Sequence, residues 1–358
     1  MSVRAICAAA SLTDPRAAAA SAAQDVWTAH HFGGDAAGAA AASLTAGMDV
    51  DCGSFVKQNG MAALKSGKLT TAALDKAVSH LFRLRIRLGY FDDPESTPWG
   101  KASHQSINYT QHFDHALRAA REGIVLLSHS RPVLPLTAKT VAVSGPNADN
   151  GPNMQGIDCH GVPPFLITPV HGIGNYSTVT YSEGCAIGGN DTKGFAAAAA
   201  AAEAADATVL VLGLDPSVEY EMKDRTDLLL PGAQAGLVKA CRDAMGPTKP
   251  LIVVLMGGGV VDTSPVDSMI DALLWVGYPG QSGGKALADI LFGAVAPSGR
   301  APLTWYENSY ASDASPTAVS MLDMGLRPAK EAEGLDGLGP PPSKPGPYPP
   351  HGPNPGRA

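Results

Sequence analysis

Four carboxylates and one arginine stand close together in a stretch with no regular spacing: Glu219, Glu221, Asp224, Arg225 and Asp227. Carboxylates two residues apart on an irregular loop need not share one environment. One of them can then meet substrate or solvent while its neighbour pairs with Arg225. Cleavage of a glycosidic bond needs such a pair of roles, a general acid and a second carboxylate across the bond. The spacing alone is equally typical of a solvated surface loop.

The residues on either side predict the elements that position this loop. Val209 to Leu212 is a short apolar run with β-branched residues, typical of a strand buried on both faces. Pro231 is expected to start the next helix, where its missing N–H is tolerated. In open α/β sheets, ligands bind beyond the carboxyl ends of the strands, and the acidic loop occupies that place.

From Lys139 onward, predicted strands alternate with predicted helices. The expected strands are 140–143, 178–181, 209–212, 251–255 and 272–276, and the expected helices are 195–205, 232–245 and 282–292. This alternation predicts an α/β fold, a three-layer α/β/α sandwich around a mostly parallel sheet. Residues 302–306 are expected as an edge strand, and the pattern stops after about residue 326.

The N-terminal third predicts a different organisation. Residues 35–46 and 70–88 have helical spacing, and each run ends at a glycine. Residues 113–127 are expected to form a further amphipathic helix. Residues 48–53 indicate a short strand followed by a turn.

Composition excludes several classes of partner. The 358 residues carry a net charge of −7 without a Lys/Arg-rich run, which argues against nucleic acid and anionic membranes as partners. No apolar run approaches the roughly 20 residues of a membrane span. Five scattered cysteines without a CxxC pair argue against structural zinc, allow one or two disulfides and leave at least one thiol free.

Three sequons, at Asn108, Asn175 and Asn190, fit a secreted glycoprotein, although chance matches are about as common. The first ten residues make a poor signal peptide, with a single arginine and a short apolar stretch.

Ordered motifs run from about residue 24 to residue 326. They are HHF at 30–32, AGMDVDCG at 46–53, REGIVLL at 121–127, GPNA at 145–148, TPVHG at 168–172, the acidic loop with its flanks at 213–232, GYPGQSGG at 277–284, and the stretch 288–306. Together they resemble glycoside hydrolase family 3, specifically its plant and fungal β-xylosidase-like branch.

The resemblance implies an end of a (β/α)8-like barrel at 24–55, a helical linker at 56–112 and the α/β/α sandwich at 113–326. Residues 1–23 are expected to be unstructured, and residues 327–358 to form a Pro/Gly-rich disordered tail.

The same resemblance implies an exo-acting, retaining O-glycosyl hydrolase that acts in xylan and cell-wall breakdown, outside the cell or in the cell wall. Its substrate would be an oligosaccharide or an aryl β-glycoside, with no metal or organic cofactor. The general acid/base would be Glu221, with Glu219 as the alternative, and Asp224 and Arg225 would fix the loop.

The chain departs from the family where the nucleophile is expected. Residues 17–23 fill that place and contain no carboxylate, so no nucleophile is assigned and an incomplete or inactive form is expected. A non-catalytic sugar-binding sandwich is the alternative function, and a nucleotide-binding module rests only on the glycine turns after 256 and 276. The choice among xylose, arabinose and glucose, and the oligomeric state, stay open.

Overall fold

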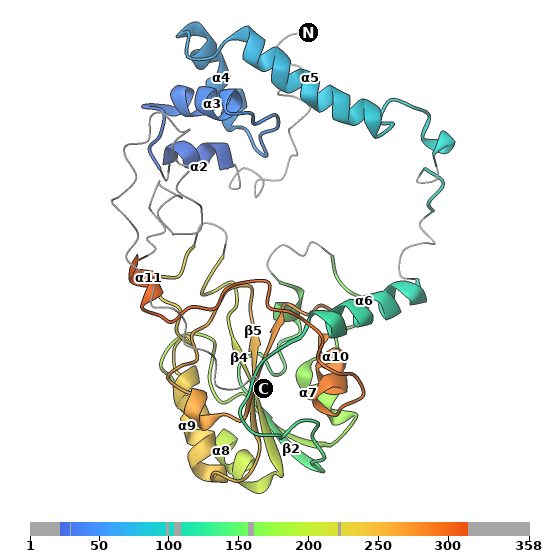
Figure 1. The fold of residues 1–358 in the computed structure, drawn as a ribbon, viewed down its shortest axis with the longest axis vertical. Helices are drawn as coiled ribbons and strands as arrows, with labels where there is room; N and C mark the ends of the chain where they lie inside the picture. The colour runs from blue at the N-terminus through green and yellow to red at the C-terminus, as the bar shows by residue number, and fades with distance from the viewer. Residues whose placement is uncertain are drawn as a thin grey trace, which may run out of the picture. The chain divides into compact units, whose positions relative to one another are not determined.

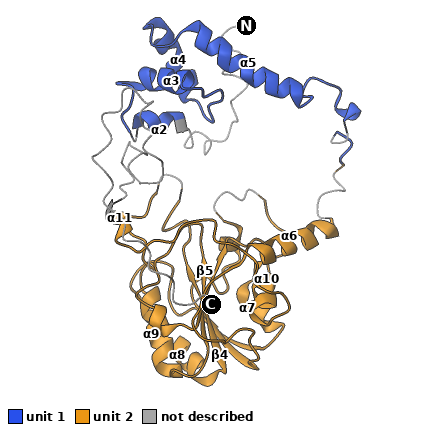
Figure 2. Cartoon of the chain, viewed as in Figure 1, with its two compact units in different colours: residues 1–102, 314–358 blue, residues 103–313 orange. Residues whose placement is uncertain are grey.

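The structure is a computed structural model that describes residues 22–28, 30–97, 100–103, 109–156, 161–220 and 223–313. The chain divides into two compact units, one formed by residues 1–102 and 314–358 and the other by residues 103–313 (Figure 2). The expected unstructured N-terminus up to residue 21, and the expected tail from residue 327, lie outside the described residues. No helix in the described ranges is both long and apolar enough to cross a bilayer.

The first unit is helical where it is described. Its helices are α2 (Ala22–Thr28), α3 (Ala36–Thr45), α4 (Phe55–Lys65) and α5 (Thr71–Arg87). Most buried positions of α3 are small, Gly38 and Ala39 to Ala41, and Leu44 is the larger buried side chain that packs with its neighbours. Asp35 caps α3 by accepting from the N–H of Gly38 at 2.6 Å. The assignment of residues 24–55 to the end of a barrel stays a prediction.

The short strand expected at 48–53 is wrong. These residues form an irregular loop, and the described part of this unit contains no strand for them to pair with. Their carboxylates bind helices instead: Asp51 accepts from the N–H of Val56 at 2.9 Å, and Asp49 pairs with His80 at 3.1 Å. The side chains of Asp49 and Asp51 therefore contact helices rather than a neighbouring strand.

The second unit contains a six-stranded sheet in the order β1-β6-β5-β4-β2-β3 (Figure 1). Its strands are β1 (Val125–His129), β2 (Thr140–Ser144), β3 (Thr178–Ser182), β4 (Ala207–Gly213), β5 (Leu251–Met256) and β6 (Ala272–Gly277). All neighbours are parallel except β1, which pairs antiparallel with β6. The five predicted strands and the α/β fold class are thus confirmed.

Helices cover both faces of this sheet (Figure 1). The helices are α6 (Thr110–Gly123), α7 (Pro169–Gly174), α8 (Phe195–Ala204), α9 (Gln234–Met245), α10 (Gly283–Leu291) and α11 (Tyr310–Asp313). Along β4, Val209 and Val211 join a core with α7 and α10, while Leu210 and Leu212 join a core with α8 and α9. Successive side chains on a strand point to opposite faces, so one continuous apolar run supplies two cores.

The structure differs from two predictions at the β6 edge. The expected helix 113–127 is present as α6 but ends at Gly123, and Val125 to His129 pair with β6 as β1. The edge strand expected at residues 302–306 is wrong, because these residues are irregular and β1 pairs with β6 at that edge. Trp305 packs edge to face on Trp275 instead, with ring centroids 6.5 Å apart.

A buried carboxylate joins the elements on one face of the sheet. Asp289 on α10 is 1% exposed and accepts from Arg121 of α6, from Lys285 at 2.7 Å and from the hydroxyl of Tyr176 at 2.5 Å. Burial opposes ionisation of Asp289, but Lys285, Tyr176 and Arg121 outweigh it and lower its pKa. Asp289 is therefore a charged anchor between α10 and its neighbours.

We expect Asp289→Asn to lower the free energy of unfolding by about 3 kcal/mol, because two cations lose their buried partner. The lowered pKa gives a stabilisation that is complete above about pH 4 and is lost as the pH falls through the folded-state pKa. Urea unfolding between pH 3 and 7 measures both effects. Asp243→Asn, which removes an exposed carboxylate paired with Lys239 on α9, is the matched control and should leave stability unchanged. Equal loss in both variants would contradict the anchor role.

Candidate active site

The acidic loop begins where β4 ends, and a buried glutamine fixes that end. The side-chain oxygen of Gln234 accepts from the N–H of Gly213 at 2.7 Å, and its amide donates to the carbonyls of Gly213 and Ile187. Gln234 is the first residue of α9 and is fully buried. The expected start at Pro231 is displaced because Gly232 adopts φ +55, which is left-handed backbone rather than helix.

Glu219 and Arg225 form an ion pair across the loop. The Arg225 Nε donates to Glu219 Oε2 at 2.7 Å, and the side chains are only 10% and 22% exposed, respectively. Arg225 Nη2 also donates to the carbonyl of Val260 at 2.8 Å, and the N–H of Gly259 donates to Glu219 Oε1 at 3.1 Å. The pair therefore fastens the loop after β4 to the segment after β5.

A side chain at Gly259 would displace the ion pair from its present position. A Cβ at this position would lie 2.7 Å from Arg225 Nη2 and 2.9 Å from both carboxylate oxygens of Glu219. In the glycine run after β5, the backbone of Gly259 approaches the ion pair closely. This contact accounts for a glycine at position 259 without a bound phosphate.

The second half of the loop is held by a buried aspartate. The N–H of Asp262 donates to the carbonyl of Leu228 at 2.7 Å, and the N–H of Leu228 donates to the side chain of Asn308 at 2.7 Å. Burial opposes ionisation of Asp262, but the N–H groups of Ser264 and Asn308 donate to its carboxylate, and its pKa is lowered. The loop is therefore ordered at both ends without regular secondary structure.

The predicted site residues fare differently. Glu221 lies outside the described residues, as does Met222, but their neighbours Tyr220 and Lys223 exchange two backbone hydrogen bonds of 3.0 and 2.8 Å. Asp224 is exposed on the loop. In the described part of the chain, Arg225 pairs with Glu219 rather than with Asp224.

Tyr278 follows β6 and completes this edge of the sheet. Its hydroxyl is buried and has no hydrogen-bond partner among the described residues. Burial, followed by the negative charge of Glu219, raises the pKa of the phenol, so Tyr278 stays protonated at neutral pH. No group of three or more His, Cys, Asp or Glu side chains is placed to hold a metal ion in the described ranges.

Sequence reasoning missed four residues that build the site: Gly259, Asp262, Gln234 and Asn308. They come from segments far apart in the chain, and their types are common in turns and helix starts. The one feature of the sequence that could have pointed to these contacts was the glycine run at 257–259. Glycine has no Cβ and therefore allows two segments of backbone and side chain to approach closely.

Residues 124–332 match the glycosyl hydrolase family 3 C-terminal domain. The chain belongs to glycosyl hydrolase family 3. The match covers β1 to α11 and therefore the whole sheet, the acidic loop and its supports.

Two similar plant and fungal proteins are named as xylosidases. The chain is 41% identical over 298 residues to beta-D-xylosidase 1 of Arabidopsis thaliana, covering 82% of this chain and 38% of that protein. It is also 41% identical over 312 residues to a probable exo-1,4-beta-xylosidase of Aspergillus clavatus, covering 85% of this chain and 38% of that protein. The chain thus spans less than two fifths of these relatives.

A solved structure of a family 3 exo-beta-xylosidase in complex with a xylobiose aziridine probe has a similar fold. The TM-score is 0.72 at 36% identity, over 86% of this chain and 39% of that one. A beta-glucosidase from Listeria innocua in complex with isofagomine is more distant, with a TM-score of 0.64 at 26% identity, over 77% of this chain and 38% of that one.

We expect Glu219→Gln to lower the free energy of unfolding by about 1–3 kcal/mol, because it leaves the nearly buried Arg225 guanidinium without its charged partner. Chemical denaturation measures the change. The exposed Glu203 on α8 provides a matched control, since Glu203→Gln makes the same chemical change and should leave stability as it is. A Glu219→Gln variant as stable as wild type would show that the pair does not hold the loop.

Proposed function

We propose that this chain carries the acid/base part of a retaining, β-xylosidase-like glycoside hydrolase, with Glu221 as the general acid/base. The substrate would be an oligosaccharide or an aryl β-glycoside. No residue of this chain is assigned as the nucleophile. One observation carries the proposal. In a chain that belongs to family 3, the Glu219 carboxylate is already paired with Arg225 and accepts from the N–H of Gly259.

A general acid must hold a proton within reach of the leaving oxygen and then take one back from water. The Glu219 carboxylate accepts from a guanidinium and a backbone N–H, so proton transfer would require it to leave both donors. Of the two glutamates in the loop, Glu219 is therefore the structural one. This supports Glu221 as the group that transfers the proton.

In the proposed reaction, a carboxylate nucleophile, a role assigned to no residue of this chain, attacks the anomeric carbon and forms a glycosyl-enzyme bond while Glu221 protonates the leaving-group oxygen. The Glu221 carboxylate then deprotonates the water that displaces the nucleophile. Retention requires the nucleophile to lie about 5–5.5 Å from Glu221. Arg225 acts through Glu219 as a positioning residue, because it holds the first half of the loop in place.

We expect Glu221→Gln to lower kcat/KM for phenyl β-xyloside by about 10²–10⁴-fold, because phenolate is a poor leaving group that needs the proton. Hydrolysis of 2,4-dinitrophenyl β-xyloside should fall much less in its first step, since that leaving group departs without protonation. Added azide should restore turnover and yield β-xylosyl azide, because azide attacks the glycosyl-enzyme without a general base.

Glu219→Gln is the matched control for this test. It should slow both aryl xylosides by a similar factor, because it disturbs the position of the loop and not the proton transfer. A leaving-group dependence in Glu219→Gln that is absent from Glu221→Gln would exchange the two roles. If native protein hydrolysed neither xyloside, the hydrolase proposal would fail, and sugar binding without catalysis would replace it.

We propose further that the protein is secreted and N-glycosylated. Asn175, at the end of α7, and Asn190, before α8, are both exposed, as a glycosylation site requires, and Asn108 lies outside the described residues. We expect peptide N-glycosidase F to increase the mobility of the native protein on a denaturing gel. Asn175→Gln and Asn190→Gln should each remove part of that shift, whereas unchanged mobility after treatment would contradict the proposal.

A further inference from the structure

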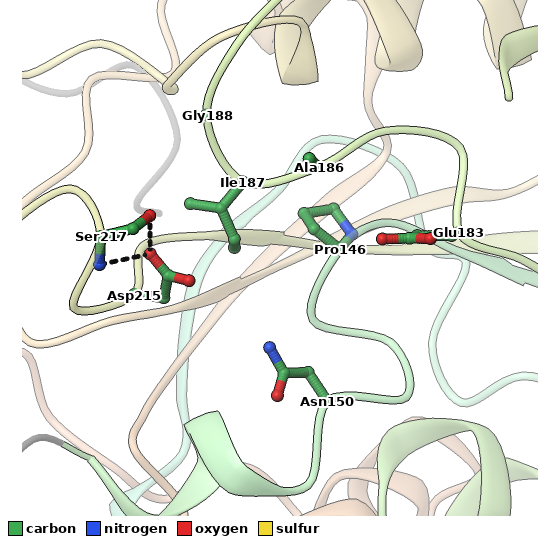
Figure 3. Close-up of a pocket in the computed structure, with 8 residues that line it drawn as sticks. All are labelled: Pro146, Asn150, Glu183, Ala186, Ile187, Gly188, Asp215 and Ser217. Atoms are coloured by element: carbon green, nitrogen blue, oxygen red, sulfur yellow. Dashed lines mark hydrogen bonds between the residues drawn. The ribbon is translucent and has the colours of Figure 1, made fainter. Parts of the chain in front are cut away.

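A second polar site lies beside the acidic loop, at the carboxyl ends of β2, β3 and β4. A pocket of about 420 Å³ opens there, within the range of about 300–1,000 Å³ typical of small-molecule sites. Its lining comes from three separate connections of the second unit: Pro146, Asn150, Glu183, Ala186, Ile187, Gly188, Asp215 and Ser217 (Figure 3).

The topology explains why a pocket forms at this point. The chain passes from β2 to β3 on one side and then returns to place β4 on the other side of β2. The connections after β2 and β4 therefore leave in opposite directions, which opens a crevice between them. Two buried asparagines link the connection after β2 to β4. Asn147 donates to the carbonyl of Leu212 at 3.2 Å, and Asn153 donates to Asn147 at 2.7 Å.

The polar groups of the lining keep hydrogen-bonding capacity for a ligand. Asp215 Oδ1 accepts from the N–H of Ser217 at 2.9 Å and from its hydroxyl, while its other oxygen receives no donor from the described residues. Asn150 accepts from the N–H of Asn153 at 3.2 Å through its oxygen, and its amide nitrogen points toward the pocket (Figure 3). The Glu183 side chain is exposed and lies on the far side of Pro146 from Asp215 (Figure 3).

This arrangement fits a sugar better than a cation. The two carboxylates are separated by the apolar side chains of Pro146 and Ile187 instead of converging on one point (Figure 3). Apolar surface flanked by separate acceptors and an amide suits a pyranose, whose C–H face packs on aliphatic groups while its hydroxyls donate to carboxylates. The pocket also lies on the connection that carries Glu219 and Glu221, since Asp215 and Ser217 begin that connection.

We propose that this pocket binds a xylose unit on the leaving-group side of the scissile bond, with Glu183, Asp215 and Asn150 as the polar contacts. The assignment to the leaving-group side rests on the proposed function, because Glu221, the acid that protonates the leaving oxygen, belongs to the same connection after β4 as Asp215. Glu183 is then a specificity residue contributed by the sandwich itself, from the loop between β3 and α8.

Equilibrium binding of thioxylobiose, in which sulfur replaces the bridging oxygen so that a glycosidase does not cleave it, tests the pocket independently of hydrolysis. Calorimetry with the native protein measures this binding. We expect Glu183→Gln and Asn150→Ala to weaken binding about ten-fold or more, as the loss of a charge-assisted or well-placed hydrogen bond does. Glu203→Gln, the same change on the exposed surface of α8, should bind as wild type does. Thermal melting of each variant separates a lost contact from a lost fold.

Absence of thioxylobiose binding by the native protein, or equal binding by the Glu183, Asn150 and Glu203 variants, would overturn the inference. Calcium binding that competes with thioxylobiose and is lost in Glu183→Gln would also overturn it, because the pocket would then be a cation site. Hydrolysis of phenyl β-xyloside by the native protein is measured beside this binding. Binding without hydrolysis in the native protein would therefore refute the proposed function and leave the sugar pocket standing.

Discussion

The ion pair between Arg225 and Glu219 is the interaction on which the geometry of this edge of the sheet depends. It joins the connection after β4 to the connection after β5, and it is made between two side chains that are largely withdrawn from water. Separating such a pair leaves a poorly solvated charge, so the loop is held in one position without a helix or a strand. A loop that is irregular in backbone is thereby fixed in space.

The position of the candidate site follows from how the sheet is covered. Both faces of the central strands are covered by helices, and β4 and β5 are buried along their whole length. The acidic loop, Tyr278 and the proposed sugar pocket all lie at the edge where the parallel strands end, which is where open α/β sheets bind ligands. At that edge the regular hydrogen bonds of the sheet end. The side chain of Gln234 accepts from Gly213 there, and the hydrogen bond from Asn153 to Asn147 links the connection after β2.

Three carboxylates show how surroundings decide the role of one functional group. Asp289 is buried among Arg121, Lys285 and Tyr176 and anchors helices. Glu219 is partly buried, has one cation and one N–H, and fixes a loop. Glu183 is exposed at the rim of a pocket, where its capacity to accept hydrogen bonds is available to a ligand. Exposure and prior partners, not residue type, separate these roles.

The sequence by itself determined the elements with a strong local signal. Five of the six strands and helices α8, α9 and α10 could be predicted, because apolar runs and helical spacing are properties of neighbouring residues. The family resemblance followed from ordered motifs, and the short match of residues 213–232 located the acidic loop. Glu221 as the acid/base stays a prediction, because that residue lies outside the described part of the chain.

Only the tertiary structure decided which distant segments meet. The sequence placed residues 125–127 at the end of a predicted helix, yet residues 125–129 pair with β6 as a strand, and residues 302–306 do not join the sheet. The contact of Glu219 with Gly259 spans 40 positions, and the pocket unites three connections. No local pattern encodes such contacts, because they depend on the order in which the strands lie in the sheet and on how closely two segments can approach.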